Sequence, residues 1–300
     1  MSAPDILVIG RDGQLARSLA ERARTLRITL ASIGRPELDL AHLEMIGPEL
    51  RGMGAKIIIN AAAYTAVDLA ESESSLSEQV NAIAPGVIAA EARAVGARVV
   101  HLSTDYVFDG ASTEPYVESA TVGPLGVYGR TKLSGEGAVR AAGPDHAIVR
   151  TSWVYSPFGR NFVRTMLELA RTRERLRVVD DQIGNPTSAL DLADGLLVLA
   201  TSWLAGGEVG LGQTYHLAGT GATSWAGLAR ETFAISARLG GPTAQVEPIA
   251  TSQWPTAAAR PRNSRLDSSR FAADFGFSAP PWRESLALVV QRLLEDRPAR

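Results

Sequence analysis

"DILVIGRDGQLA" occupies residues 5–16, and this stretch decides the fold class. Asp5–Ile9 is a short apolar run that predicts a buried strand, and Gln14–Thr25 has the pattern of a helix. Between them, Gly10 and Gly13 allow a tight turn in which backbone amides approach a ligand closely. A strand, a glycine turn and a helix in this order are typical of the first unit of a dinucleotide-binding sheet. The alternative is a tight turn that binds no ligand.

The alternation of strands and helices continues to about residue 151. Short apolar runs predict strands, and apolar residues at helical spacing predict helices between them. Such strands are typical of a parallel sheet covered by helices on both faces. The predicted fold class is therefore α/β, a Rossmann-type doubly wound parallel sheet. Further strands are expected at Arg27–Ile33, Lys56–Asn60, Ala97–Ser103 and Ala147–Thr151, with helices at Pro85–Val95 and Tyr128–Ala141.

The second half of the chain has a more mixed pattern, and no linker marks a clean boundary. We assign residues 1–152 to a dinucleotide-binding Rossmann domain. Residues 153–300 are assigned mainly to a smaller C-terminal α/β substrate-binding region that interleaves with the first. Its expected elements are helices at Phe162–Thr172, Ser188–Ser202 and Pro280–Leu294, a strand at Gln245–Ala250, a glycine-rich loop at Ser202–Gln213 and an irregular segment at Trp254–Arg265.

The composition excludes several classes of function. With 300 residues and a net charge of −2, the chain has no global field that favours nucleic acid or an anionic membrane. No apolar run reaches the roughly 18 residues of a membrane span. Cysteine is absent, which removes disulfides and thiol catalysis, and the four histidines lack metal-ligand spacing. The first residues lack the basic segment of a signal peptide, so we expect a cytoplasmic enzyme without a metal site.

The glycine turn predicts where a nicotinamide dinucleotide binds. The helix that follows directs its first N–H groups towards a pyrophosphate. Ala16 stands where a third glycine is typical, and its extra methyl group must fit between helix and strand. After the third strand, small residues let a flat ligand lie against the sheet edge. The residues expected to contact the cofactor in these two segments are Gly10, Asp12, Gly13, Gln14, Leu15, Ala62, Ala63 and Tyr64.

The end of the second strand bears on the choice between NADPH and NADH. An acidic residue there would pair with the ribose 2′-hydroxyl of NAD. This chain has Arg35 instead, and Arg11 lies within the glycine turn. Two guanidinium groups can hold a 2′-phosphate, so NADPH is expected over NADH. The alternative is that both arginines face solvent. Asp39 and Leu40 follow and are expected to contact the adenine.

Tyr128 and Lys132 lie one helical turn apart. On a helix they share one face, about 6 Å apart along the axis. The fourth strand ends at Ser103, Thr104 and Asp105, which brings hydroxyl groups to the same edge of the sheet. Reduction of a ketone adds hydride to carbon and a proton to oxygen, and a tyrosine can supply that proton. We therefore predict Tyr128, Lys132 and Thr104 as catalytic residues; the alternative is an exposed helix pair.

The electrostatics of this pair explain the choice of residues. A free tyrosine has a pKa of about 10. An ammonium group about 5 Å away, at an effective dielectric constant of about 20, favours the phenolate by roughly 3 kcal/mol, or about 2 pK units. Lys132 is one of two lysines among 30 Lys and Arg residues. A compact ammonium group suits a ribose hydroxyl better than a forked guanidinium does, which explains why arginine does not serve here.

At these residues the chain resembles the extended short-chain dehydrogenase/reductases, and more narrowly the dTDP-4-dehydrorhamnose reductase family. The matching motifs follow one another along nearly the whole chain. RTSWVY (150–155), DQIGNPT (181–187) and NSRLD (263–267) are far more specific than the Tyr–Lys pair. Further matches are GRDGQL (10–15), NAAAYTAVDLAESE (60–73), VNAIAP (80–85), STDYVFDG (103–110), PLGVYGRTK (124–132), GEGAV (135–139), NFVRTM (161–166) and YHLAG (215–219).

The resemblance implies reduction of dTDP-4-dehydro-β-L-rhamnose to dTDP-β-L-rhamnose. Hydride passes from NADPH or NADH to C4 of the sugar, and Tyr128 donates the proton. Trp153 is expected to stack on the apolar face of the sugar, or alternatively to pack in the core. Asn161 and Arg260 are expected near the nucleotide diphosphate, or alternatively in a helix cap and an ion pair. The implied substrate-binding residues are Thr104, Asp105, Tyr106, Trp153, Asn161 and Arg260.

Two positions depart from the family pattern: Ala16 replaces glycine in the turn, and Arg262 stands where glycine is common. Family members can form a homodimer with magnesium at its interface, but no acidic cluster in this sequence identifies such ligands. Two other functions stay open. One is a reductase or epimerase of another 4-keto nucleotide sugar, and the other is a non-catalytic nucleotide-binding regulatory subunit. The intact Thr104, Tyr128 and Lys132 argue against a regulatory subunit.

Overall fold

The centre of the molecule is a six-stranded parallel sheet. The computed structural model describes residues 3–295, so the outer ends of both predicted domains, 1–2 and 296–300, lie outside the described residues. The strands of this sheet are β1 (Ile6–Ile9), β2 (Leu30–Ile33), β3 (Ile57–Asn60), β4 (Arg98–Thr104), β5 (His146–Thr151) and β10 (Gln213–His216). Their order is β10-β5-β4-β3-β1-β2, and every neighbouring pair is parallel. The predicted Rossmann-type α/β class is confirmed.

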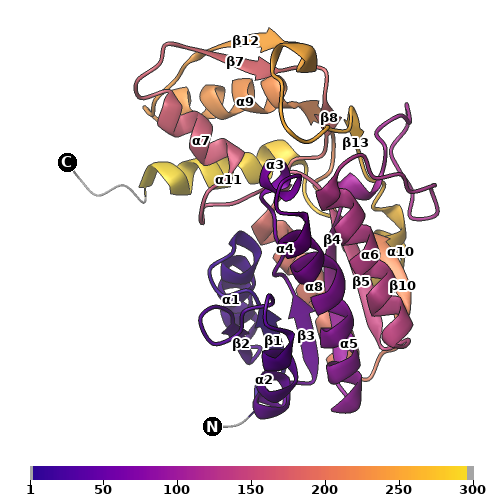
Figure 1. The fold of residues 1–300 in the computed structure, drawn as a ribbon. Helices are drawn as coiled ribbons and strands as arrows, with labels where there is room; N and C mark the ends of the chain where they lie inside the picture. Colours follow the sequence, from indigo (N-terminus) through magenta and orange to yellow (C-terminus); the bar gives the residue numbers. More distant parts are fainter. Residues whose placement is uncertain (1–2, 296–300) are drawn as a thin grey trace.

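Helices cover both faces of this sheet (Figure 1). Successive strand residues point to opposite faces, so Leu7 belongs to one hydrophobic core and Val8 to the other. The helices on the Val8 side are α1 (Gln14–Leu26) and α8 (Ala189–Leu204). Those on the Leu7 side are α2 (Ile46–Met53), α5 (Ala84–Ala94) and α6 (Val127–Ala142). Two buried cores on one sheet explain why its central strands β1 and β3 are almost entirely apolar.

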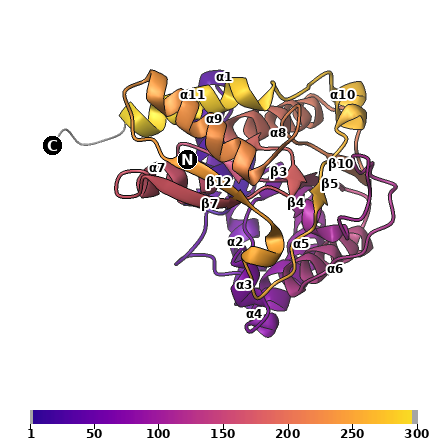
Figure 2. The same ribbon diagram turned by 90° about the horizontal axis from the view of Figure 1, so that it is seen from above.

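A smaller layer lies beyond the carboxyl ends of the large sheet's strands (Figure 1). Figure 2 shows its β7, β12, α7 and α9 lying together when seen from above. Its helices are α7 (Phe162–Leu169), α9 (Trp225–Arg238) and α11 (Trp282–Glu295). Its strands are β6 (Val154–Tyr155), β7 (Arg175–Val179), β8 (Ile183–Gly184), β9 (Thr187–Ser188), β11 (Thr223–Ser224), β12 (Gln245–Ile249) and β13 (Asn263–Ser264).

Short helices complete the described fold. They are η1 (Leu43–Met45), α3 (Val67–Ala70), α4 (Ser74–Glu78), the π-helical η2 (Gln79–Ile83), η3 (Asp105–Val107), η4 (Thr251–Gln253) and α10 (Ser269–Phe275). Within residues 3–295, no helix is both long and apolar enough to cross a membrane.

Some elements differ from the sequence-based prediction. The predicted helix Phe162–Thr172 ends at Leu169. The predicted loop Ser202–Gln213 begins three residues later than expected, at Ala205, because α8 continues to Leu204. The sequence pattern does not predict α9, although this helix buries Leu228 and Phe233. Gly227 and Thr232 interrupt its apolar residues, which hides the helical period.

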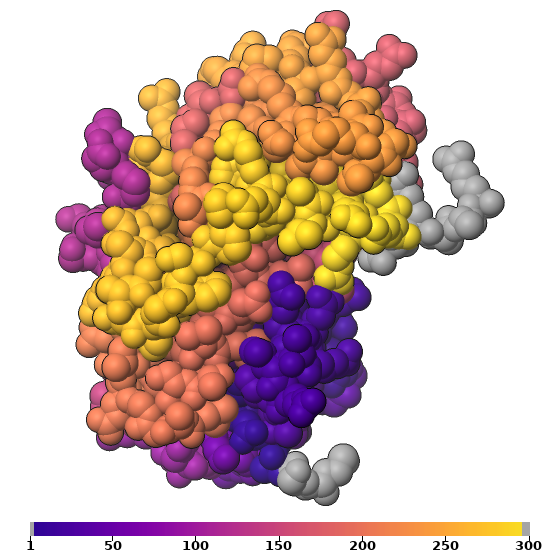
Figure 3. All heavy atoms as spheres, turned by 180° about the vertical axis from the view of Figure 1, so that it is seen from behind, coloured from indigo at the N-terminus to yellow at the C-terminus, as the bar shows by residue number. Residues whose placement is uncertain are grey.

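Helix α11 joins the two layers. In the space-filling view from behind, it forms a band between α9 and the N-terminal segment (Figure 3). Leu286 and Val289 of α11 pack with Leu228 of α9 in one core. On the other side, the Arg292 guanidinium donates two hydrogen bonds to the Glu21 carboxylate of α1, at 2.7 and 2.8 Å. The smaller layer is therefore fixed against the sheet from which the cofactor turn emerges.

Candidate active site

Most of the predicted site residues follow the carboxyl ends of neighbouring strands. The strand order reverses at β1, which lies between β3 and β2. Open α/β sheets bind ligands in the crevice at such a switch point. The glycine turn follows β1, Ala62–Tyr64 follow β3, and Thr104 ends β4. The topology thus brings three segments that are far apart in sequence to one edge of the sheet.

The glycine turn is shaped by a close backbone contact. Gly10 has φ +118°, and a methyl group added there would lie 3.4 Å from the backbone of Ala61 and Ala62. In α1, no side chain caps the N-terminus and the first turn carries no acidic residue. The first N–H groups therefore lack side-chain partners. Ala16 is 1% exposed within the core, so its methyl group fits between helix and strand.

The other predicted cofactor residues are held by long-range hydrogen bonds. The Asn81 side chain of η2 accepts from the backbone N–H of Tyr64 at 2.8 Å and donates to its carbonyl oxygen at 3.0 Å. Gln14 accepts at Oε1 from the Ser156 hydroxyl group at 2.9 Å. Both walls of the crevice thus have fixed positions.

Thr104 lies close enough to Tyr128 to act on the pKa of its phenol, while the Thr104 hydroxyl group itself donates to Asp105 Oδ1 at 3.1 Å. Thr104 ends β4, and Tyr128 is the second residue of α6, whose N-cap is Gly126. The Tyr106 ring meets the Tyr128 ring edge to face, with centroids 5.4 Å apart. Burial raises the pKa of Tyr128 to about 12; the Thr104 hydrogen bond acts in the opposite direction and Asp105 adds to the rise. The phenol is therefore protonated at neutral pH.

The Lys132 ammonium group is buried beside the same strand. Its Nζ donates to the Leu102 carbonyl oxygen at 2.6 Å. Burial lowers the pKa of Lys132 to about 8, and the Glu136 carboxylate counteracts this. The lowered tyrosine pKa that the sequence predicts is not what the structure has. The physical reason is desolvation of the phenol. The Lys132 ammonium group, which is bound to the Leu102 carbonyl oxygen, is not among the groups that shift the Tyr128 pKa.

Two of the six predicted substrate residues line a cavity of about 320 Å³. Tyr106 and Trp153 line it, together with Phe162 and Trp225. Asp105 is 3% exposed, and burial raises its pKa to about 6, against hydrogen bonds from Ser264 and Thr104 that lower it. Its Oδ2 has no hydrogen-bond partner among the described residues. A buried acceptor without a partner could accept a hydrogen bond from a hydroxyl-bearing ligand.

Comparison with known proteins settles the family. The sequence-family model described as "RmlD substrate binding domain" matches residues 4–295 of this chain. The chain belongs to this family of dTDP-4-dehydrorhamnose reductases. A relative of that name from Sinorhizobium fredii is 43% identical over 289 residues, which cover 96% of this chain and 97% of the relative. One from Escherichia coli K12 is 39% identical over 298 residues, which cover 97% of each.

Solved structures of reductases in this family share the fold. The Bacillus anthracis dTDP-4-dehydrorhamnose reductase, in complex with NADP, superimposes with a TM-score of 0.88 at 33% identity. The Clostridium acetobutylicum reductase gives a TM-score of 0.87 at 37% identity. Each match covers 96% of this chain and 99% of the other. The resemblance predicted from RTSWVY, DQIGNPT and NSRLD is confirmed.

The structure adds a histidine to this reductase site that the sequence did not single out. His101 of β4 is fully buried, and burial, with the nearby Lys132 charge, lowers its pKa well below the usual value. Its Nε2 lies 3.5 Å from Lys132 Nζ, and its Nδ1 lies 3.2 Å from Asn60 Nδ2. A neutral imidazole thus limits where the ammonium group can move. Nothing local in the sequence marks His101, since its partners come from β3 and α6.

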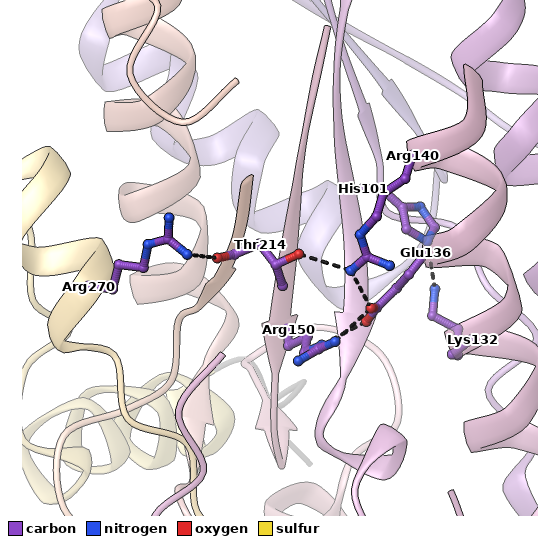
Figure 4. A network of polar contacts seen from close by, with 7 residues as sticks. All are labelled: His101, Lys132, Glu136, Arg140, Arg150, Thr214 and Arg270. Carbon is purple, nitrogen blue, oxygen red and sulfur yellow. Dashed lines mark hydrogen bonds and ion pairs between the residues drawn. The ribbon is translucent and has the colours of Figure 1, made fainter. Parts of the chain in front are cut away.

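An ion-pair network lies one turn further along α6 (Figure 4). The Glu136 carboxylate accepts two hydrogen bonds from Arg150 of β5, at 2.8 and 2.7 Å, and one from Arg140 at 2.9 Å. Glu136 is fully buried and Arg150 is 3% exposed. The network ties α6, which carries Tyr128 and Lys132, to the central sheet. A signal existed in the sequence, because Tyr128, Lys132 and Glu136 follow one another at four-residue spacing.

In the structure, Asn161 caps a helix and Arg260 forms an ion pair, which are the alternative roles that the sequence left open for them. Asn161 caps α7 by accepting from the Arg164 N–H at 3.1 Å, and its amide donates to the Ser156 carbonyl oxygen at 2.9 Å. Arg260 pairs with Asp68 of α3, with 2.7 Å between Nη2 and Oδ2. Their contact with a nucleotide diphosphate stays a prediction.

The segment after β2 lies beside the glycine turn, since Gly10 N–H donates to the Ile33 carbonyl oxygen at 2.8 Å. Arg35 is exposed there. Arg11 forms an ion pair with Glu37, with 2.7 Å between Nη1 and Oε2. Of the two adenine candidates, Leu40 is 5% exposed and packs in a core, and Asp39 accepts from the Ala41 N–H at 3.0 Å.

The described residues do not fit a metal ion. Within residues 3–295, no group of three or more His, Asp or Glu side chains is arranged to hold one. No step of the chemistry is therefore assigned to magnesium.

Proposed function

We propose that this chain reduces the C4 ketone of dTDP-4-dehydro-β-L-rhamnose to dTDP-β-L-rhamnose, with NADPH as the hydride donor. The observation that carries the proposal is the buried phenol of Tyr128 beside Thr104, with Lys132 one helical turn further on, within a chain of the reductase family. Relatives from two bacteria bear the name of this reaction. A regulatory subunit would need no proton donor, so the buried phenol favours an enzyme.

The cofactor side of the proposal rests on the glycine turn. A helix N-terminus without a side-chain cap or an acidic residue suits a pyrophosphate. Bound NADPH supplies the hydride. We assign Gly10, Asp12, Gly13, Gln14 and Leu15 to the diphosphate, Arg35 to the 2′-phosphate, Asp39 and Leu40 to the adenine, and Ala62, Ala63, Tyr64, Tyr128 and Lys132 to the nicotinamide side.

Tyr128 supplies the proton in this proposal. Because burial raises its pKa to about 12, the hydroxyl group is protonated when the substrate binds. The ketone oxygen becomes alkoxide-like as hydride arrives, and an alkoxide is a stronger base than a phenolate, so the proton passes to it readily. Thr104 donates to or accepts from the phenol, and the Lys132 ammonium group favours the phenolate that is left.

The smaller layer supplies half of the substrate-binding residues in this proposal. Residues 153–300 contribute Trp153, Asn161 and Arg260, while Thr104, Asp105 and Tyr106 come from the large sheet. The free Asp105 Oδ2 supports a contact with a sugar hydroxyl group.

The alkaline limb of the pH profile is expected near pH 8. Lys132 is protonated below its pKa of about 8 and loses its charge as the pH rises through that value. Glu136 and neutral His101 are the titratable groups that face it, and neither titrates near pH 8 because the pKa of each is lowered. We therefore expect kcat, measured from NADPH oxidation between pH 6 and 10, to fall above about pH 8. Activity that stays flat to pH 10 would contradict this role for Lys132.

Arg35→Ala is expected to raise KM for NADPH by about tenfold and to leave KM for NADH unchanged. A charge-assisted hydrogen bond to the 2′-phosphate contributes about 1.5 kcal/mol at the low end of its range. Glu37→Gln is the matched variant: it removes the carboxylate that neutralises Arg11, so it should lower KM for NADPH. Equal KM changes for the two cofactors in Arg35→Ala would refute the assignment.

One assay tests the proposed function as a whole. Purified protein is given dTDP-4-dehydro-β-L-rhamnose with NADPH and with NADH separately, and loss of reduced-cofactor absorbance is followed. Proton NMR of the product identifies the C4 configuration. A second arm offers a 4-keto sugar on another nucleotide, which tests the alternative enzyme. Absence of turnover in every arm would support the regulatory subunit instead.

A cytoplasmic location and a homodimer complete the proposal, and both rest on the family resemblance. The absence of cysteine accords with a reducing compartment. Light scattering coupled to size-exclusion chromatography, run with and without EDTA, tests both the dimer and any dependence on magnesium.

A further inference from the structure

Trp153 has an unusual backbone conformation for its size. Its φ is +48°, in the left-handed region that bulky residues rarely adopt. Such outliers persist where the surrounding structure holds them, and they cluster at ligand sites. Here the Trp153 carbonyl oxygen accepts from the Thr187 N–H of β9 at 3.2 Å, which fixes the backbone just before β6.

One face of the Trp153 indole is covered by a second indole. The Trp225 ring, at the start of α9, stacks on it with centroids 3.6 Å apart and planes only 9° from parallel. Trp225 is itself fixed, since its Nε1 donates to Gln182 Oε1 at 3.2 Å and the Phe162 ring packs on it at 4.7 Å.

The other face of Trp153 is covered by Gly184 of β8. A methyl group added at Gly184 would lie 2.5 Å from Cε2, 2.7 Å from Nε1 and 2.9 Å from Cδ2 of the Trp153 indole. Cε2 is bonded to the other two atoms, so similar short distances to all three place that methyl group above the ring plane. Since Trp225 occupies one face, Gly184 occupies the other.

Trp153 lines the cavity, and the edge of its indole is the part that neither Trp225 nor Gly184 covers. An aromatic face carries negative potential and the edge carries positive potential, with the Nε1–H donor in the same plane. An edge suits the electron-rich oxygen atoms of a sugar, whereas an apolar sugar face requires the open face of a ring. An edge contact is thus an alternative to the expected face-on stacking of Trp153 on the sugar, which stays a prediction.

We propose that Trp225 and Gly184 are positioning residues that clamp Trp153, so that its edge, and not its face, meets oxygen atoms of the nucleotide sugar. That the ligand is a nucleotide sugar rests on the proposed function. Trp225 acts through Trp153 and sets the width of the cavity at that wall. Glycine is required at 184 because any side chain there would displace the indole.

Kinetics of Trp225→Leu, Trp225→Phe and Gly184→Ala test the clamp. Trp225→Leu and Gly184→Ala should each raise KM for the sugar nucleotide about tenfold, the size of one lost aromatic contact. KM for NADPH should stay within about twofold of the unchanged protein. Trp225→Phe, which keeps a stacked ring, should restore most of the affinity. Trp254→Leu is the matched control, because that indole is 53% exposed.

A spectroscopic measurement is independent of turnover. Two stacked indoles couple electronically, so the near-ultraviolet circular dichroism of the protein alone should change in Trp225→Leu and not in Trp254→Leu. If the protein does not turn over the proposed substrate, KM cannot be measured. The affinity of each variant for dTDP, measured by calorimetry, is then compared instead. The inference is overturned if Gly184→Ala and Trp225→Leu leave the sugar-nucleotide KM and the dTDP affinity unchanged, or if they raise KM for both substrates equally. If Trp225→Leu does not fold, Gly184→Ala and Trp225→Phe decide the outcome.

Discussion

Replacing Tyr128 with phenylalanine is expected to lower kcat for the reduction by about 10²–10⁴-fold, the usual contribution of a positioned proton donor. The substitution removes one hydroxyl group and keeps the ring that packs edge to face with Tyr106. The fold should therefore survive, and KM for NADPH should change little. Steady-state oxidation of NADPH and a thermal melt measure the two effects separately.

Tyr215→Phe is the matched control for Tyr128→Phe. Tyr215 is also a buried tyrosine, and its hydroxyl group donates to Asp274 Oδ2 at 2.5 Å, between β10 and α10. Its loss should cost stability by about 0.5–1.5 kcal/mol, the net contribution of one hydrogen bond, because the exposed Asp274 carboxylate can turn to water, and it should not change kcat. A Tyr128→Phe protein that retains kcat within about threefold would show that another group donates the proton.

The raised pKa of Tyr128 also predicts an asymmetry between the two directions of the reaction. Reduction needs the protonated phenol, which is present at neutral pH because the pKa is about 12. Oxidation of the product would need the phenolate. As long as the pH is below the pKa of Tyr128, each increase of one pH unit raises the phenolate fraction tenfold. The oxidation rate of dTDP-L-rhamnose should therefore rise with pH where the reduction rate does not, which stopped assays in both directions can measure.

Glu136→Gln is expected to lower the free energy of unfolding by about 3–5 kcal/mol, because it leaves the buried Arg150 guanidinium without its counter-ion. Burial alone would raise the pKa of Glu136, but the hydrogen bonds and charge of Arg150 outweigh it, so the pKa is lowered. Because the pKa of Glu136 is lowered in the folded protein, the ion pair stabilises the fold fully at pH values above the pKa of a glutamate in the unfolded chain. This stabilisation is lost as the pH falls through the pKa that Glu136 has in the folded protein. Urea denaturation at neutral pH measures the change.

Two further variants make the Glu136 prediction specific. The double variant Glu136→Gln/Arg150→Met removes both charges, and it should be less destabilised than the sum of the single variants. Glu91→Gln breaks the exposed pair with Arg51 and should cost at most about 1 kcal/mol. If Glu136→Gln costs no more than Glu91→Gln, the network does not hold α6 against the sheet.

Much of the first half of the fold could be predicted because its signals are local. An apolar run, Gly10 and the helix from Gln14 lie within a dozen residues and predict the first strand, turn and helix. Helix α9 could not be predicted in the same way. Its small and polar residues, such as Ala229 and Thr232, are buried, and the helix packs against α7, α11 and β12, which no short window of sequence contains.

The sequence by itself determined which groups could do chemistry and roughly where they lie. Tyr128 and Lys132 share a face because helical geometry fixes the position of the fourth residue along, and Thr104 joins them because parallel strands end at one edge of the sheet. Only the tertiary structure decided what these groups experience. Solvation and ring packing depend on residues far apart in sequence, so the raised pKa of Tyr128 and the covered faces of Trp153 followed from burial and from Trp225 and Gly184.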